Sequence, residues 1–199
     1  TIEVASKVVD LQSMVSTEIE VRKQQLASGA RAGGLESDAD SNNSAGGSAD
    51  QRRQDVDDQY QQIRVALAAD IQMGLAEVER DGDRIIVRLA SQGSFISGSA
   101  DLQPGFTGLL TRVGNSLSAT SGKVRVEGHT DNVPIAFSER FNSNWDLSAA
   151  RSASIADFFA QNSALDQGAI TVAGFADTRP IDTNNTAAGR ARNRRIEVI

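Results

Sequence analysis

The sequence predicts a layered α/β domain over residues 82–199, with a mixed sheet in the order βαβαββ, preceded by N-terminal helices. Segments in which apolar and polar residues alternate are separated by segments with helical spacing, which is typical of strands and helices packed in layers. The order ends in two strands, which permits an antiparallel member of the sheet. Before this domain we expect an arm (1–27), a linker (28–50) and a connecting helix (51–81).

Residues 1–27 are expected to form an amphipathic helix. Apolar residues recur there at intervals of three, four and seven: Val4, Val8, Leu11, Val15, Ile19 and Leu26. Such a stripe needs a packing partner. An ordinary docking helix or coiled-coil stem is favoured over a regulatory arm, because most stripes of this kind are packing faces.

Residues 28–50 are rich in Gly, Ala, Ser, Asp and Asn, and they lack the apolar surface that would offset the entropy of ordering. We interpret them as a flexible linker. Helical spacing resumes over 51–81, where Asp81-Gly82 is expected to end the helix with a turn. The apolar positions of this helix are Val56, Tyr60, Ile63, Leu67, Ile71, Leu75 and Val78.

Two helices and four strands are expected in the domain itself. Pro104 opens the first helix, and Ser148 is expected to be the N-cap of the second. Their apolar faces hold Phe106, Leu109, Val113 and Leu117 in one, and Ile155, Phe158 and Phe159 in the other. The strands are expected at Arg84 to Leu89, from Val124, at Ile170 to Val172 and at Ile196 to Val198.

Composition excludes several classes of function. No run approaches the roughly 18 apolar residues of a spanning helix, so we expect no membrane segment in these 199 residues, and the start at Thr1 suggests a fragment of a longer protein. The net charge of -6 lies in residues 1–80 (8 basic and 14 acidic residues), while residues 81–199 hold 12 of each, so the basic patch of a nucleic-acid-binding protein is missing. With no cysteine and one histidine, we expect neither a metal site nor a cofactor.

A candidate site follows the strand at Val124. The polar residues from His129 to Asn132 come where that strand ends, and Arg151 falls in the first turn of the helix expected to start at Ser148. A helix N-terminus and a guanidinium favour an anion, while the carboxylate of Asp131 favours a cation. A ligand that carries both an ammonium and a carboxylate, such as an amino acid presented on a polymer, satisfies both.

These residues also carry a family resemblance. Gly128-His129-Thr130-Asp131, Asn144-x-x-Leu147-Ser148-x-x-Arg151 and Asn193-Arg194-Arg195-Ile196-Glu197-Val198 resemble, in order and spacing, the OmpA-like peptidoglycan-binding domain over residues 82–199. The segment from Thr130 to Ile135, followed by Arg140-Phe141-x-Ser143-Asn144-Trp145, resembles the stator B subunits of the flagellar motor (the MotB/PomB family). An ordinary OmpA-type loop is shorter there and lacks the Trp.

The resemblance implies an OmpA-like fold and a periplasmic anchor that fixes the ion-driven stator to the cell wall. The peptidoglycan-binding residues it implies are Thr130, Asp131, Asn132, Asn144, Leu147, Ser148, Arg151 and, less directly, Arg194. The implied ligand is the stem-peptide diamino acid with its adjoining sugar. The implied partners are a stator A subunit, reached through a single membrane helix outside this sequence, a second copy of the domain, and periplasmic motor-ring proteins.

Simpler roles compete at several of these positions. Asp131 alone would be interpreted as a carboxylate that caps its own loop. His129 is expected to be packed or hydrogen-bonded, and Trp145 to be a core or lid anchor rather than a sugar platform. Arg194 and Arg195 are neighbours on a strand and point to opposite faces, so at most one of them joins the site.

Two other functions compete with that of a stator anchor. Ser148, His129 and Asp131 are the components of a hydrolase triad, but His129 and Asp131 are only two residues apart, no Gly-x-Ser-x-Gly elbow surrounds Ser148, and helix capping is the expected role of that serine. We therefore expect no enzyme. An OmpA- or Pal-type envelope anchor, or a secretion-system wall anchor, would use the same domain.

Overall fold

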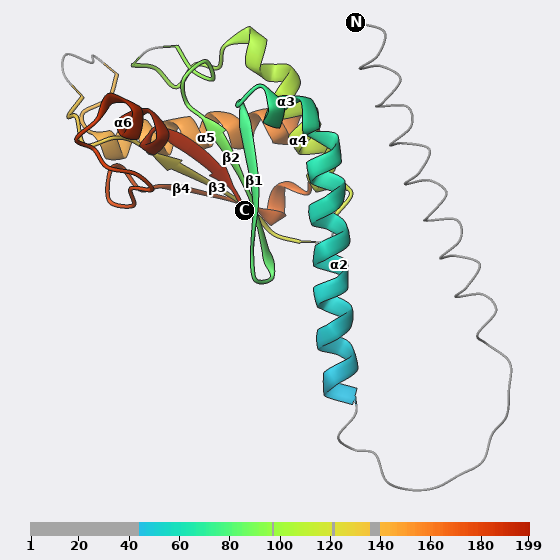
Figure 1. The fold of residues 1–199 in the computed structure, drawn as a ribbon. Coiled ribbons are helices and arrows are strands. Elements are labelled where there is room, and N and C mark those ends of the chain that lie inside the picture. Colours follow the sequence, from blue (N-terminus) through green and yellow to red (C-terminus); the bar gives the residue numbers. More distant parts are fainter. Residues whose placement is uncertain (1–43, 97, 121, 136–139) are drawn as a thin grey trace, which may run out of the picture. The chain divides into compact units, whose positions relative to one another are not determined.

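The computed structural model describes residues 44–199 except 97, 121 and 136–139, and the side chains from Asp50 onward. Ser44–Ile199 form one compact unit (Figure 1). The predicted arm, and the predicted linker up to residue 43, lie outside the described residues. Within the described ranges, no helix has both the length and the apolar character needed to cross a membrane.

The domain is built on a five-stranded mixed sheet in the order β1-β2-β5-β3-β4. β3 and β4 are parallel, whereas β5 runs antiparallel to both β2 and β3, so the predicted antiparallel member is present. The strands are β1 (Ala76–Asp81), β2 (Arg84–Ala90), β3 (Val124–His129), β4 (Ile170–Gly174) and β5 (Arg195–Val198). The predicted layered α/β class is confirmed.

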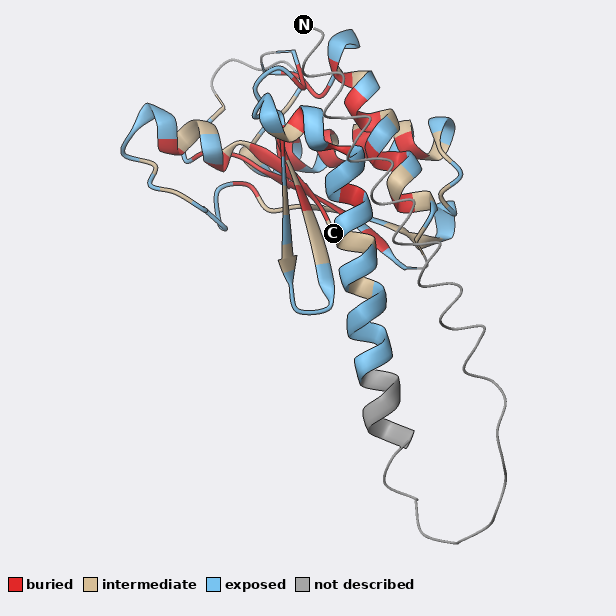
Figure 2. Ribbon diagram, turned by 45° about the vertical axis from the view of Figure 1, so that its right-hand side comes forward, coloured by how far each residue is buried: buried red, intermediate tan, exposed pale blue. Residues whose placement is uncertain are grey.

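Two long helices and the sheet enclose the core. They are α4 (Thr107–Ser118), which follows a 3-10 turn at Pro104–Phe106, and α5 (Asn144–Asn162). Figure 2 shows buried residues along both helices and the central strands, whereas much of α2 (Ser44–Ala66) is exposed. Fully buried apolar side chains of this core include Leu67, Leu89, Leu110, Val113, Val126, Ile155, Phe159, Ile196 and Val198.

The segment before residue 82 differs from the prediction. The expected single helix over 51–81 is instead α2, the short α3 (Ala68–Gln72) and strand β1, and α2 begins inside the predicted linker. Gly74 and Gly82, both with positive φ, end the helical part and turn β1 back onto β2. The predicted domain boundary at residue 82 is therefore wrong, because β1 belongs to the sheet.

α3 is held to the domain by an ion pair between the buried Asp70 and the half-exposed Arg112. Asp70 is 1% exposed, and its two carboxylate oxygens accept hydrogen bonds from Arg112 of α4 at 2.6 and 2.9 Å. Ile63 and Leu67 of the preceding turns are buried in the same core. The helices before β1 are thus an integral part of the fold.

α5 begins earlier than expected. Ser143 is its N-cap, and the Ser143 hydroxyl accepts a hydrogen bond from the Asp146 amide at 3.2 Å, so the prediction that Ser148 caps this helix is wrong. Arg151 is consequently the eighth residue of α5, about two turns away from the free amides at the start of the helix. α6 (Ala187–Asn193), the short helix before β5, is not among the predicted elements.

Candidate functional site

The site lies where α5 crosses the carboxyl end of β3. Gly128 of β3 and Gly174 of β4 have no room for a side chain, because a Cβ would overlap the Ser148 carbonyl at Gly128 and would lie 2.5 Å from the Ala149 amide nitrogen at Gly174. The backbone of α5 therefore packs directly on both strands. This contact sets the position of α5 side chains relative to the loop that leaves β3.

Asp131, on that loop, is 7% exposed and pairs with Arg194. Its Oδ2 accepts a hydrogen bond from Arg194 Nη1 at 2.5 Å, and its Oδ1 accepts one from the Val133 amide at 3.0 Å. Asp131 thus caps its own loop and also faces a cation from the segment before β5. Of the two adjacent arginines only Arg194 joins the site, since Arg195 pairs with Glu197 at 2.7 Å.

Arg151 brings a second guanidinium beside this pair. It is 7% exposed, donates from Nε to the Ser99 carbonyl at 2.9 Å, and lies 5.1 Å from the centre of the Phe95 ring. Burial lowers the pKa of Arg151 to about 10, with a further lowering from Arg194 and an opposing effect from Asp131. Among the residues that the structure describes, none accepts a hydrogen bond from its Nη1 or Nη2.

Asn144 ties the start of α5 to the loop after β3. Its side-chain amide donates to the carbonyls of Asp131 at 3.2 Å and Val133 at 3.0 Å. Asn132, between them, is exposed. The predicted residues Asp131, Asn132, Asn144, Arg151 and Arg194 therefore lie together.

Ser148 and Leu147 are buried in α5 beneath the site and hold the backbone around it in place. Ser148 is fully buried; its hydroxyl donates to the Trp145 carbonyl at 3.0 Å and accepts from the Ala176 amide at 3.1 Å. Ala176 has a φ of 49°, and its carbonyl accepts from the Thr130 amide at 2.8 Å. Leu147 is 6% exposed and Ser148 has no exposed surface, so both of these predicted ligand residues act on a ligand only through their neighbours.

Thr130 contributes a buried hydroxyl to this end of the sheet. The residue is 5% exposed, and its Oγ1 has no hydrogen-bond partner in the described part of the chain. Since buried hydroxyls are normally paired, this group is an exception beside Asp131 that the described residues do not explain.

The loop after β2 forms a wall of the site that the motifs did not assign. Ser99 supplies the carbonyl that orients Arg151, and Phe95 lies against the guanidinium. Arg140, which precedes α5, connects its segment to the loop after β2, because Arg140 Nη1 donates a hydrogen bond to Asp101 Oδ2 at 2.6 Å. No motif of the sequence analysis covers this loop, so neither Phe95 nor Ser99 is among the predicted site residues.

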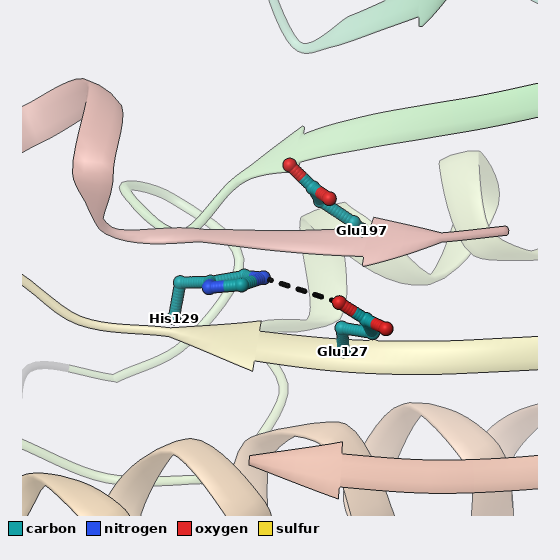
Figure 3. A group of neighbouring side chains, drawn as sticks. All are labelled: Glu127, His129 and Glu197. Carbon is teal, nitrogen blue, oxygen red and sulfur yellow. Dashed lines mark ion pairs between the residues drawn. The ribbon is translucent and has the colours of Figure 1, made fainter. Parts of the chain in front are cut away.

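A second ionic cluster occupies the other face of the sheet (Figure 3). Glu127, His129 and Glu197 come close enough to hold a metal ion, but both carboxylates already have arginine partners. Glu127 pairs with Arg125 at 2.8 Å, and Arg195 and Arg88 donate to Glu197 at 2.7 and 3.1 Å. The surrounding positive charge disfavours a metal cation, and these ion pairs hold the carboxylates in place on β3 and β5.

The three triad components do not assemble. The Ser148 hydroxyl is bonded to Trp145 and Ala176, and Asp131 is bonded to Arg194. Neither ring nitrogen of His129 has a hydrogen-bond partner among the described residues. This arrangement supplies no activated nucleophile.

Trp145 also differs from expectation. Its side chain is 52% exposed in the first turn of α5, so it is not a core anchor. His129, in contrast, is buried as predicted, and it stacks on Phe175 with ring centres 5.6 Å apart.

Comparisons with known proteins find a matching family and several similar proteins. The sequence pattern of the OmpA family matches residues 94–194. Motility protein B of Bacillus subtilis is 32% identical, and the match covers 62% of this chain and 47% of that protein. The probable lipoprotein YiaD of Escherichia coli is also 32% identical, and the match covers 70% of this chain and 62% of that protein. The chain thus spans about half to three fifths of the length of these curated relatives.

Two solved structures extend the comparison. The cell wall anchor of the T6SS from Pseudomonas aeruginosa is 41% identical, with a TM-score of 0.65 over 68% of this chain and 94% of that one. A MotB-like protein from Desulfovibrio vulgaris is 24% identical with a TM-score of 0.70, covering 75% of this chain and 93% of that one, and this likeness concerns the fold alone.

Proposed function

The chain belongs to the OmpA family, and from this premise we propose that its domain binds peptidoglycan and anchors a larger envelope assembly to the cell wall. The observation that carries the proposal is the guanidinium of Arg151. The residue is 7% exposed and its Nε donates to Ser99, but its two terminal nitrogens have no partner among the described residues and are not closed off from solvent. A charge held in so buried a residue gains most from a partner of opposite charge. The site therefore favours a ligand that brings a carboxylate to Arg151.

The charges around Arg151 define the rest of the ligand. Arg151, Arg194 and Asp131 carry a formal net charge of +1, since two arginines face one aspartate. A carboxylate that accepts two parallel hydrogen bonds from Arg151 pairs with that guanidinium, and the ammonium group of the same ligand shares the Asp131 carboxylate with Arg194. The diamino acid of a peptidoglycan stem peptide carries both groups on one short side chain.

The roles of the eight predicted residues then divide into two groups. Asp131 and Arg151 contact the charged ends of the diamino acid, with Thr130, Asn132 and Arg194 beside them. Asn144, Leu147 and Ser148 hold α5 and the loop after β3 at the right separation, through the hydrogen bonds and burial described above. No cofactor or metal has a part in this function.

We assign the assembly to the flagellar motor, with this chain as the periplasmic part of a stator B subunit. The support is the segment from Phe141 to Trp145, together with the similarity to Motility protein B. In this proposal a single inner-membrane helix precedes the chain, joins it to a stator A subunit, and two copies of the domain pair. Periplasmic ring proteins of the motor are the further partners.

A secretion-system wall anchor is the second candidate. The specific observation in its favour is the 41% identity to the Pseudomonas aeruginosa T6SS anchor, which is higher than the 32% shared with Motility protein B. Deleting the gene separates the candidates: loss of swimming with normal secretion supports the stator, and the reverse supports the secretion system. Both candidates use the same wall-binding site.

Substitutions on the two charges test wall binding. We expect Asp131→Asn to abolish co-sedimentation with purified peptidoglycan, because it leaves the ammonium group of the ligand unpaired at a cost of about 2 to 5 kcal/mol. Arg151→Lys should also weaken co-sedimentation strongly. Lysine keeps the charge of Arg151 but loses the two-pronged fork and the Nε donor to Ser99. The melting temperature should change little in either variant.

The exposed ion pair of the β1–β2 turn supplies matched controls. Arg84 and Asp81 are 67% and 59% exposed and pair at 2.8 Å, so Arg84→Lys and Asp81→Asn make the same chemical changes away from the site. Both should sediment like the unchanged protein. Full sedimentation of either site variant would remove the assignment, and release of soluble muropeptides by the unchanged protein would show an enzyme instead of the non-enzymatic anchor proposed.

A further inference from the structure

The loop after β2 engages the guanidinium of Arg151 at two of its atoms. Arg151 Nε donates to the Ser99 carbonyl at 2.9 Å, and the guanidinium carbon lies over the Phe95 ring, 5.1 Å from the ring centre. The protein therefore uses the Nε donor itself and leaves the edge formed by Nη1 and Nη2 for the ligand. The position of the Ser99 carbonyl consequently determines the direction from which a carboxylate can accept two parallel hydrogen bonds.

Asp101 fixes the position of Ser99 within that loop. The Ser99 hydroxyl donates to Asp101 Oδ2 at 2.6 Å and accepts a hydrogen bond from the Asp101 amide at 2.9 Å. The Ser99 amide donates to the Ile96 carbonyl at 2.9 Å, and the Ile96 amide donates to the Asp101 carbonyl at 3.1 Å. The Ser99 backbone and the Asp101 side chain are therefore parts of one hydrogen-bonded unit.

Arg140 attaches this unit to the segment that precedes α5. Its Nη1 and Nη2 donate to the Asp101 carboxylate at 2.6 and 3.4 Å. Two residues further along the chain, the Asn142 amide donates to Asp146 Oδ2 at 3.0 Å, which joins the segment to the first turn of α5. The loop after β2 is thus attached to α5 at two points, through Arg140 at the start of the helix and through Arg151 about two turns later.

We infer that Asp101 and Arg140 are positioning residues of the ligand site, and that they act on the ligand through Arg151. A loop attached to a helix at one point is free to turn about that point, whereas attachment at two points fixes the Ser99 carbonyl relative to α5. The ion pair thereby holds the Nη edge of Arg151 in one orientation before the ligand arrives, which lowers the entropy cost of binding a carboxylate. The inference rests on the proposed function, because the carboxylate is that of the ligand proposed above.

The exposure of this ion pair allows its effects on binding and on stability to be separated. Arg140 and Asp101 are 62% and 53% exposed, so the melting temperatures of Arg140→Ala and Asp101→Ala should stay close to that of the unchanged protein. The probe is a soluble stem tetrapeptide that contains the diamino acid, titrated into the full chain by calorimetry. We expect each variant to bind this peptide about two- to fivefold more weakly, the range that one exposed ion pair implies. Arg140→Lys, which keeps the charge, should recover part of the affinity.

Two further measurements show whether the ion pair acts through Arg151. The first uses the same tetrapeptide with the free carboxylate of its diamino acid converted to an amide, which has one acceptor oxygen in place of two and no negative charge. This peptide should bind more weakly than the carboxylate form, and with the same affinity to the unchanged protein and to the variants. The second combines the substitutions: Arg140→Ala should add no further weakening to a chain that already carries Asp101→Ala, since both changes remove the same link.

Arg84→Ala is the matched control, since Arg84 forms an ion pair of similar exposure with Asp81 at the β1–β2 turn. It should bind the tetrapeptide like the unchanged protein. Unchanged affinity in Asp101→Ala and Arg140→Ala, additive losses in the double variant, or equal weakening towards the tetrapeptide and its amide would overturn the positioning role and leave the proposed function standing. Failure of the unchanged protein to bind the tetrapeptide would overturn both proposals.

Discussion

His129 is a buried base without a hydrogen bond from either ring nitrogen to the described residues. Burial is the largest cause that lowers its pKa, to about 4, and the positive charge of Arg195 lowers it further while Glu197 opposes the change. The ring is therefore neutral at pH 7, and its 3.8 Å approach to Glu127 (Figure 3) is not an ion pair there. The contribution of His129 to stability must consequently depend on pH.

The sign of this dependence follows from the direction of the pKa shift. Because the unfolded chain takes up a proton near pH 6.5 and the folded protein only near pH 4, the free energy of unfolding should fall as the pH drops through this window. Between pH 7.5 and 5 we expect a loss of about 2 kcal/mol in urea unfolding. In His129→Phe, which cannot take up a proton and still stacks on Phe175, that loss should largely disappear. Equal losses in both proteins would show that His129 does not set the pH response.

At the scale of elements, the contact of α5 with β3 determines whether the site exists. Asp131 follows β3, whereas Asn144 and Arg151 lie on α5, so a small separation of the two elements disrupts all their contacts. Gly128→Ala places a Cβ against the Ser148 carbonyl, and we expect it to destabilise the domain by about 1 to 3 kcal/mol and to weaken peptidoglycan binding as well. Thermal melts and co-sedimentation measure the two effects.

Gly105 provides the control for that substitution. It lies in the 3-10 turn before α4, and a Cβ there meets nothing within 4 Å. Gly105→Ala should therefore leave melting and binding close to those of the unchanged protein. A stable, fully binding Gly128→Ala variant would mean that α5 can shift without harm to the site.

The elements with clear periodicity were predictable from sequence, and the misplaced ones had ambiguous local signals. α4 and the four expected strands are present because their apolar spacing leaves one interpretation. The sequence predicts helix where β1 lies, because Leu75 and Val78 continue the helical spacing of the preceding residues, although Ala76, Val78 and Arg80 also alternate as in a strand. The start of α5 was misplaced because both Ser143 and Ser148 suit an N-cap, and only packing on Gly128 and Gly174 distinguishes them.

The charged residues of the site were predictable from motif and spacing, whereas their surroundings were not. Asp131, Arg151 and Arg194 were all named in advance. The Ser99 carbonyl that orients Arg151 is a backbone group 52 residues away, and no side-chain pattern marks it. The exposure of Trp145 was missed for a related reason: an aromatic residue in a helix is usually buried, and the surface available to bury it depends on the whole fold.

At the scale of the whole molecule, Ser44–Ile199 contain a complete core of their own. A chain truncated to begin at Ser44 should therefore melt at nearly the same temperature as the full chain and sediment equally well with peptidoglycan. Scanning calorimetry and co-sedimentation of the two chains measure this. A clearly lower melting temperature after truncation would show that residues 1–43 contribute to the folded core.

The position of α2 has a mechanical consequence for an anchor. α2 lines a groove with Val124 and Arg125, at the amino end of β3, and Asp57 of α2 pairs with Arg80 of β1, whereas Asp131 follows the opposite end of β3. Tension applied along the chain through α2 would pass through α3 into β1 at Ala76, which is level with Leu89 of β2, Ile196 of β5 and Gly128 of β3, the end of the sheet that Asp131 follows. The pull and the ligand therefore act at the same end of the sheet. The backbone hydrogen bonds that join β1, β2, β5 and β3 carry the load between them, so resistance to force is a property of the sheet and does not depend on the ligand site alone.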